Sequence, residues 1–593
     1  MSLSFRSLLR ESWQNLRKNF WTYLLTALIL QVFLAYLAKG LLSFVFNRVV
    51  GFAGIISLTP NTWSAIASHP LALIFFLLYL LILVGVIYLE FAILTITIAK
   101  TYQPLSIRQI IEGLPQKLRG LCGPQLLVFL FYLFLMIPLA NYGLKSSLLA
   151  NFKIPDFISG ELMKSNSGKL IYLVSLIGVA YLNLRFVYFL PLYTISNRKP
   201  SQILRESWKL TKGRQLKVLA IFGFYSLLAS LLLLIIYSGT ILVFGWLDYS
   251  GNNLLLETAL YSLMRAVNFV FIVGLKFILM IVLTSHLLSL EKFQKDLPYQ
   301  SKYDKSWVFP KWTRLLLPMT LLAWLISNGL SLYLLQTNPN ALMIAHRGDV
   351  NHGVENSITA MQAAHKAGAD YSEMDVVMTK DHQFVVSHDN NLKRLTGVDK
   401  NVSDLTLAQV TKLKTRQNGY SDHIASLDEF MKAAQACHQK IAIELKPYGH
   451  EPSNYVDLFI KKLKELKAVQ GNKIMSMKLP VIEEVERKLP QADTGYLVSL
   501  QFGPFSAHKV DFYAIEEFSY NEVVALSAYQ QKKDLYVWTI NDDTLLTRFL
   551  QSPVNGIITD KLIEFQDEKK GMKNHNSYLD RVIRLLNIEF AKD

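Results

Sequence analysis

The chain has 593 residues, of which 51% are hydrophobic, and a formal net charge of +16. A chain of this length is too long to fold around one hydrophobic core, and at least two domains are therefore expected. The 2 cysteines, Cys122 and Cys437, exclude a disulfide framework. The basic residues lie largely between apolar runs, which favours a membrane surface over nucleic acid as their partner.

Seven apolar stretches are candidates to cross a bilayer, which takes about 20 residues in a helix. The first is too long for the apolar part of a signal peptide and has no clear small-residue cleavage site, so we expect a retained helix. Residues 1–337 are therefore predicted to form an α-helical, multi-pass membrane domain. The stretches are 21–46, 72–99, 125–142, 170–194, 217–245, 266–288 and 314–336.

Positive charge alternates between the segments that flank these stretches. The N-terminus and the second, fourth and sixth loops are rich in Lys and Arg, the third is mixed, and the first and fifth carry little. Because basic loops stay in the cytoplasm, the N-terminus is expected inside and everything after residue 336 outside the cell. One miscounted crossing would reverse the side of the C-terminal half. Cys122 and Cys437 then lie on opposite sides and are not expected to pair.

A five-residue sequence, Leu-Arg-Glu-Ser-Trp, occurs at 9–13 and again at 204–208, each time before basic residues and an apolar run. A similar amphipathic stretch, 107–118, precedes the third apolar run. We interpret these segments as helices on the cytoplasmic leaflet within a repeated unit.

Three charged residues, Glu90, Arg185 and Lys276, lie inside apolar runs. Charges at this depth usually face the interior of a helix bundle or a wet cavity. The plainer interpretation is charge pairing that fixes packing. The alternative is a polar path or a pocket for a lipid headgroup.

From residue 341 onward, short β-rich runs alternate with helical patterns such as 357–367, 426–437 and 455–466. This alternation predicts an α/β domain, a (β/α)₈ TIM barrel, over 338–567, with its active site at the C-terminal ends of the strands. A charged helical tail, 568–593, is expected to end in a short amphipathic helix, 579–590, that packs on the barrel or touches the membrane. The predicted strands are 342–347, 371–378, 440–446, 473–477, 494–500, 511–516, 535–540 and 556–560.

Charged side chains occur on two of these strands. Side chains alternate between the faces of a strand, so Glu373 and Asp375 share one face, and Glu444 and Lys446 share one face of the next strand. Three converging carboxylates are understandable if a divalent cation lies between them, and oxygen ligands alone suit Mg²⁺ or Ca²⁺ better than zinc. A Glu-x-Asp pair by itself is weak evidence, because such pairs are usually solvated.

Several ordered motifs add a family resemblance. They are Ile-Ala-His-Arg-Gly at 344–348, Glu-Asn-Ser at 355–357, Gly-Ala-Asp-x-x-Glu-x-Asp-Val at 368–376, Thr-Lys-Asp at 379–381, Val-Val-Ser-His-Asp at 385–389, Ile-Glu-Leu-Lys-Pro at 443–447, Trp-Thr-Ile-Asn at 538–541 and Gly-Ile-Ile-Thr-Asp at 556–560. Together they resemble the glycerophosphodiester phosphodiesterase family over 342–565. The N-terminal half resembles the membrane domain fused to some bacterial members. Small departures are His382 where the family usually has Gly, Ser357 in place of Thr, and Ser-Met at 476–477 for the usual Ser-Phe.

The resemblance implies a metal-dependent hydrolase that releases glycerol 3-phosphate and an alcohol from a glycerophosphodiester. Trp538 either lines a glycerol pocket or is an ordinary core aromatic. Whether water or the substrate's own hydroxyl attacks is left open. The implied roles are general acid and base for His346 and His388, metal ligation for Glu373, Asp375 and Glu444, and phosphate binding for Arg347 and Lys446.

Three other functions remain open at this point. The enzyme could act on a polyglycerolphosphate polymer such as lipoteichoic acid instead of small diesters. The barrel could be a binding module of a membrane transporter or lipid-handling protein, or a phospholipase acting on intact lipid. No nucleic-acid partner is expected, the lipid bilayer is the expected surroundings, and the sequence does not predict the oligomeric state.

Overall fold

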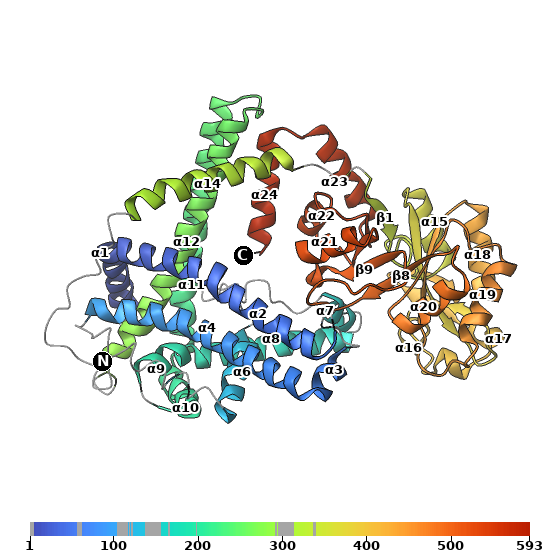
Figure 1. The fold of residues 1–593 in the computed structure, drawn as a ribbon, viewed down its shortest axis with the longest axis horizontal. Helices are drawn as coiled ribbons and strands as arrows, with labels where there is room; N and C mark the ends of the chain where they lie inside the picture. Colours follow the sequence, from blue (N-terminus) through green and yellow to red (C-terminus); the bar gives the residue numbers. More distant parts are fainter. Residues whose placement is uncertain are drawn as a thin grey trace.

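Apolar residues dominate the long helices of the N-terminal half, and a closed barrel of parallel strands forms the C-terminal half (Figure 1). The computed structural model describes residues 5–55, 58, 62–102, 117, 119, 123–136, 156–163, 166–196, 198–290, 293, 313–335, 338 and 340–592.

Five of the seven predicted spans are found as helices long and apolar enough to cross a bilayer. The first combines α1 (Phe5–Val32), a π-helical segment (Phe33–Ala38) and α2 (Lys39–Phe52). The others are α4 (Pro70–Tyr102), α8 (Asn166–Phe186) continued by α9 (Phe189–Ile195), α11 (Gln215–Leu247) and α12 (Leu254–Leu288).

The two remaining stretches contain shorter apolar helices, α6 (Pro124–Met136) and α14 (Thr313–Leu334). Residues 137–142 of the third predicted span lie outside the described residues. The described residues of this half also include the short helices α3 (Trp63–Ser68), α7 (Asp156–Met163) and α10 (Pro200–Thr211).

The two copies of the repeated pentapeptide occupy similar environments. Ser12 and Ser207 are buried while the tryptophans after them are exposed. The Ser12 hydroxyl lies 2.6 Å from the hydroxyl of Tyr225, and the Ser207 hydroxyl donates to the carbonyl of Arg185 at 2.8 Å. The first copy is part of α1, and the second is part of α10. The stretch 107–118 lies outside the described residues apart from Lys117.

The charges within the apolar helices are engaged with neighbouring groups. Lys276 on α12 forms an ion pair with the buried Glu90 on α4. The Arg185 guanidinium donates to the carbonyl of Trp208 at 2.7 Å. Its Cζ also lies 4.0 Å from the centre of an aromatic ring of Trp208. These contacts support the packing interpretation of the three charges.

All eight predicted barrel strands are present, within a few residues of the expected bounds. Each is parallel to its neighbours, and the last pairs with the first to close the barrel. Alternate side chains such as Ile344, Ala442, Phe512 and Ile558 pack together in one buried cluster. The strands in spatial order are β1 (Leu342–Ala345), β2 (Tyr371–Met378), β6 (Ile441–Leu445), β7 (Lys473–Ser476), β8 (Asp493–Val498), β9 (Phe512–Glu516), β10 (Asp534–Trp538) and β11 (Gly556–Thr559).

Helices follow most of these strands and carry the outer core. They are α15 (Ile358–Lys366), α18 (Leu427–Ala436), α19 (Tyr455–Glu465), α20 (Leu479–Lys488), α21 (Glu522–Gln530), α22 (Asp543–Phe549) and α23 (Leu562–Asn574). The expected helices 357–367, 426–437 and 455–466 match α15, α18 and α19. Between β8 and β9 the chain forms no helix.

An insertion between β2 and β6 was not predicted. It contains β3 (Phe384–Val386), which runs antiparallel to β2, the helices α16 (Lys393–Thr396) and α17 (Leu407–Val410), and a hairpin of β4 (Lys414–Gln417) and β5 (Tyr420–His423). The hairpin strands are short and polar, so they lack the alternation that identifies a strand from sequence.

Among the described residues, the C-terminal half contacts the membrane half through the β8–β9 connection and through the final helix. Leu58, after α2, and Phe502, in the β8–β9 connection, exchange backbone hydrogen bonds of 3.0 and 3.1 Å. The final helix α24 (Tyr578–Lys592) packs against α22, α12 and α14 (Figure 1). The amphipathic helix predicted at 579–590 is thus present. The predicted boundary at 567 falls inside α23, so the tail begins after Asn574.

Candidate functional site

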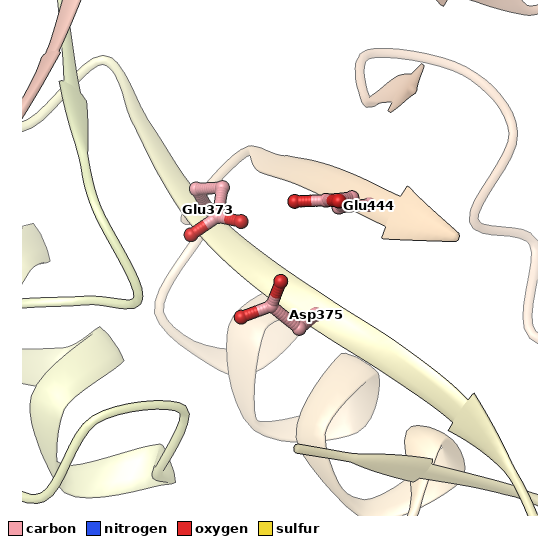
Figure 2. A group of neighbouring side chains, drawn as sticks. All are labelled: Glu373, Asp375 and Glu444. Atoms are coloured by element: carbon pink, nitrogen blue, oxygen red, sulfur yellow. The ribbon is translucent and has the colours of Figure 1, made fainter. Parts of the chain in front are cut away.

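Three carboxylates meet at one end of the barrel. Glu373 and Asp375 come from β2, and Glu444 comes from the neighbouring strand β6, where the register pairs it with Asp375. All three are buried, and each offers an oxygen within 4.8 Å of the others. Figure 2 shows the three groups pointing toward one another from the two strands. The structure therefore brings together the three residues predicted as metal ligands.

The loop after β1 holds two of these carboxylates in place. The backbone N–H of Arg347 donates to Glu373 Oε2 at 2.7 Å. Asn356 donates from Nδ2 to Asp375 Oδ2 at 2.7 Å and accepts from the Asp375 backbone N–H at 2.9 Å. Arg347 and Asn356 both have left-handed backbones, with φ of 57° and 60°. Such conformations are uncommon outside glycine and are retained where the surrounding structure enforces them.

Two cations lie beside the carboxylates. Lys446 Nζ is 3.2 Å from Asp375 Oδ1 and 3.8 Å from Glu444 Oε1, and Arg347 Nε is 3.5 Å from Asp375 Oδ2. Burial alone would raise the pKa of Asp375, but Lys446, His388 and Arg347 together hold that pKa well below its usual value. Asp375 is therefore an anion at neutral pH.

Glu373 and Glu444 behave differently from Asp375. Burial, followed by the charges of Asp375 and Glu444, raises the pKa of Glu373 well above its usual value. Burial raises the pKa of Glu444 to about 7 although Lys446 opposes the shift. Two of the three carboxylates are thus costly to ionise without further positive charge.

This donor set fits a divalent cation. Asp375 Oδ1 is buried and, apart from its ion pair with Lys446, accepts no hydrogen bond within the described part of the chain. The three groups offer only oxygen, as Mg²⁺ and Ca²⁺ prefer, and a bound cation would favour the ionised form of all three. The residues therefore match the prediction made from the strand pattern, and the identity of the ion stays a prediction.

Each predicted catalytic histidine has an aspartate partner. His346, after β1, places Nδ1 2.8 Å from Oδ1 of Asp560, after β11. His388, after β3, places Nδ1 2.7 Å from Oδ1 of Asp389. A carboxylate acceptor keeps the proton on Nδ1, which leaves Nε2 of each ring for a substrate. Burial lowers the pKa of His388 against the opposing charges of Asp375 and Asp389.

A buried network, which the sequence analysis missed, joins Arg347 to His388. Glu355 accepts from Arg347 Nη1 at 3.2 Å and from Arg394 Nη1 at 2.9 Å, and Arg394 Nε donates to Asp389 Oδ2 at 2.7 Å. Burial would raise the pKa of Asp389, but the hydrogen bonds from His388 and Arg394 lower it to about 2.

The residues that support the predicted site differ in whether a sequence motif contained them. Asp560, Asp389, Glu355 and Asn356 stood in the quoted motifs without an assigned role. Arg394 lay outside every motif, and no sequence signal pointed to it. Its position beside Glu355 depends on the unpredicted insertion.

Two departures from the family pattern have structural explanations. His382 adopts a left-handed backbone with φ of 56°, which is the conformation that a glycine would supply. Ser357 caps α15 by accepting from the Ala360 backbone N–H, a role that threonine performs equally.

Trp538 ends β10, and its indole N–H donates to the Ala514 carbonyl at 3.1 Å. It packs on the same buried cluster as Phe512 and Tyr536. This contact is that of a core aromatic, and its role in a glycerol pocket stays a prediction.

Comparison with known proteins gives matches to both halves. Residues 9–326 match the family described as the membrane domain of glycerophosphoryl diester phosphodiesterase. Residues 346–564 match the glycerophosphoryl diester phosphodiesterase family.

Individual relatives match the C-terminal half. The glycerophosphodiester phosphodiesterase of Caldanaerobacter subterraneus is 30% identical over 227 residues, which is 37% of this chain and 93% of that protein. Human lysophospholipase D GDPD1 is 51% identical over 67 residues, 11% of this chain and 21% of its own length. A glycerophosphodiester phosphodiesterase structure from Parabacteroides distasonis is 22% identical, with a TM-score of 0.34, and the match covers 40% of this chain and 98% of that one.

Proposed function

This chain belongs to the glycerophosphoryl diester phosphodiesterase family, and we propose that it is a membrane-anchored, metal-dependent hydrolase with a histidine acid–base pair and an extracytoplasmic barrel. Its substrates would be glycerophosphodiesters, cleaved to glycerol 3-phosphate and an alcohol. The observation that carries the proposal is the cluster of Glu373, Asp375 and Glu444 at the C-terminal ends of the strands.

The phosphate would be bound by positive charge. A phosphodiester is an anion, so attack on phosphorus requires charges that offset what builds on its oxygens. Glu373, Asp375 and Glu444 would hold a divalent cation, which when bound supplies part of this charge. Arg347 and Lys446 add two further cations beside the same carboxylates.

Proton transfer would fall to the two imidazoles. One Nε2 takes the proton from the attacking oxygen, and the other Nε2 gives a proton to the leaving alkoxide. Asp560 and Asp389 would hold the rings in the tautomer that this exchange requires. Both histidines lie on the β1–β3 side of the site, next to Arg347.

The membrane contacts support an extracytoplasmic barrel. Leu58 follows the first span, Gly251 lies between the fifth and sixth, and Leu332 is near the end of the last. Leu58 bonds to Phe502 of the barrel, and Gly251 and Leu332 accept hydrogen bonds from α24 at 3.0 and 2.8 Å. In an alternating path these three points share one side, opposite the basic loops.

The test of the chemistry is glycerol 3-phosphate release from glycerophosphocholine by the full-length protein in detergent, with Mg²⁺, with Ca²⁺ and with EDTA. We expect release that EDTA abolishes and added cation restores. Glu373→Gln and Glu444→Gln should lower kcat at least about 100-fold while the melting temperature is kept. Glu564→Gln, an exposed change on α23, is the matched control. Metal-independent release, or full activity in both Glu373→Gln and Glu444→Gln, would show that these carboxylates do not form a catalytic metal site.

The test of sidedness is cysteine labelling in intact cells, with Cys122 and Cys437 replaced by alanine. A membrane-impermeant maleimide should label Lys464→Cys on the barrel before permeabilisation and Lys199→Cys, before α10, only after it. Both positions are exposed. The reverse order would place the barrel in the cytoplasm.

A further inference from the structure

One barrel helix differs from the others in what it exposes. The barrel helices all lie within the described residues 340–592. Among them, α15, α18 and α19 turn side chains such as Gln362, Lys432 and Lys464 to the outside. Helix α21 instead exposes Val523, Leu526 and Tyr529, at 58%, 54% and 80%. Steps of three residues put these side chains on one stripe of the helix.

Exposed apolar side chains are concentrated in this sector of the barrel. Between residues 341 and 588 eight large apolar side chains are exposed, and five of them lie on α21, α23 and α24. They are Val523, Leu526, Tyr529, Ile563 and Ile583. Scattered apolar residues are normal on a protein surface, whereas a grouped set marks a site of contact.

The same sector lies close to the end of the last span. Asn338 donates from its backbone N–H to the Leu550 carbonyl, directly after α22, at 2.7 Å, and from Nδ2 to Val554 at 2.6 Å. Asn338 is four positions after Leu334, the end of α14, so its Cα lies at most about 14 Å from the end of that helix.

Both ends of the sector are fixed to the membrane half. Asn338, in the connection from α14, bonds to the barrel at the N-terminal ends of the strands, and Phe502 of the barrel bonds to Leu58 at the C-terminal ends. In Figure 1, α21 and α22 lie on the side of the barrel that faces the membrane helices, and α18 and α19 lie on the far side. The flank between β8 and β10 therefore faces the membrane, and α21 belongs to that flank.

From this geometry we infer that the Val523–Leu526–Tyr529 stripe of α21 is a lipid-contact surface that sits in the headgroup–acyl boundary of the leaflet beneath the barrel. The stripe lies on the same flank as α24, which packs against α22 of the barrel and against α12 and α14 of the membrane half. Tyr529, the most exposed residue of the stripe, suits the headgroup–acyl boundary, because its ring is apolar and its hydroxyl can stay in water. Helices α21 and α22 follow the neighbouring strands β9 and β10 and run in the same direction. Tyr529, like Leu550, therefore lies near the end of the barrel at which the chain arrives from the last span.

The inference is independent of the proposed reaction, and so is its test. A bimane label is placed at Leu526→Cys in the full chain, with Cys122 and Cys437 replaced by alanine, and the protein is reconstituted in phosphatidylcholine nanodiscs. Lys464→Cys on α19 is the matched control. An unchanged melting temperature shows that the fold is intact.

We expect the label at 526 to emit at shorter wavelength than the label at 464, and to lose fluorescence when lipids carry a nitroxide near the headgroup end of the acyl chain. Tyr529→Cys should respond in the same way. Equal quenching of both positions by aqueous iodide alone would overturn the inference, because the stripe would then face water. Protection of position 526 from both quenchers would also overturn it, because protein would then cover the stripe.

Discussion

The hydrogen bond that His346 donates to Asp560 offers a sharp test of the acid–base assignment. Asp560 has two carboxylate oxygens in different roles. Oδ1 lies 2.8 Å from His346 Nδ1, and Oδ2 accepts from Asn541 Nδ2. The orientation of Asn541 is itself fixed, because its Oδ1 accepts from the Asp560 backbone N–H at 2.8 Å. In Asp560→Asn the amide oxygen must therefore face Asn541, and the amide N–H₂ must face the histidine.

That exchange reverses the histidine tautomer. An N–H₂ directed at Nδ1 of His346 requires an unprotonated Nδ1, so the ring proton moves to Nε2, and Nε2 can no longer accept one. A hydrogen bond to a charged group contributes about 1.5–3 kcal/mol, and about 1.4 kcal/mol corresponds to a factor of ten in rate. We expect kcat to fall about 10- to 100-fold, and KM to change little because Asp560 does not contact the predicted phosphate site.

The assay is glycerol 3-phosphate release from glycerophosphocholine by the full-length protein at saturating cation, with kcat and KM measured separately. Asp567→Asn, an exposed change of the same kind on α23, is the control. If kcat of Asp560→Asn equals that of the unmodified chain, His346 does not depend on this tautomer and its assignment as acid or base is wrong.

Three further changes test the surroundings of the site and the link to the membrane. Asn356→Ala removes both hydrogen bonds to Asp375, so the half-saturating cation concentration in the same assay should rise about 10- to 100-fold. Gly251→Ala would place Cβ 2.8 Å from Leu579 Cβ at a backbone φ of +64°, so the melting temperature in detergent should fall by the equivalent of about 1 kcal/mol. Because the pKa of Asp389 is depressed to about 2, the stability it contributes is complete above about pH 4 and is lost toward pH 2, and Asp389→Asn should lack this loss in urea titrations.

Each of these has a control or an opposing outcome. Gln362→Ala on the surface of α15 should leave the cation requirement unchanged. Gly239→Ala in α11, where a Cβ meets nothing within 4 Å, should leave the melting temperature unchanged. An identical acid dependence of stability with and without the Asp389 carboxylate would show that its hydrogen bonds to His388 and Arg394 do not persist in solution.

The barrel was predictable because each of its strands has a sequence pattern that identifies it without reference to the other strands. A buried parallel strand such as Ile441–Leu445 is a short apolar run bounded by turns, and the charged residue inside it identifies the inner face. The membrane helices were predictable for a similar reason, since hydropathy over about 20 residues is a strong signal.

The parts that escaped prediction depend on distant pairings. Glu355 and Arg394 are 39 positions apart, and they meet only because the unpredicted insertion folds back over the loop after β1. The polar strands Lys414–Gln417 and Tyr420–His423 pair with each other across a turn, with no apolar alternation to reveal them. The sequence did not decide whether the final helix packs on the barrel or on the membrane. An amphipathic pattern predicts that one face of a helix is covered, but it does not identify the partner.

The position of α24 has a consequence for biosynthesis. Its 15 residues come after the whole barrel in the chain, yet Val582 and Leu586 complete a cluster with Leu260, Tyr261 and Leu332 of helices made much earlier. While the ribosome is translating the barrel, that patch of α12 and α14 lacks its protein partner. Domains fold in the order in which they emerge, so the membrane half would wait, incomplete, until the barrel is finished. Nonsense mutations or proteolysis in the connection after Asn574 would leave a barrel joined to a bundle whose patch on α12 and α14 lacks its protein partner.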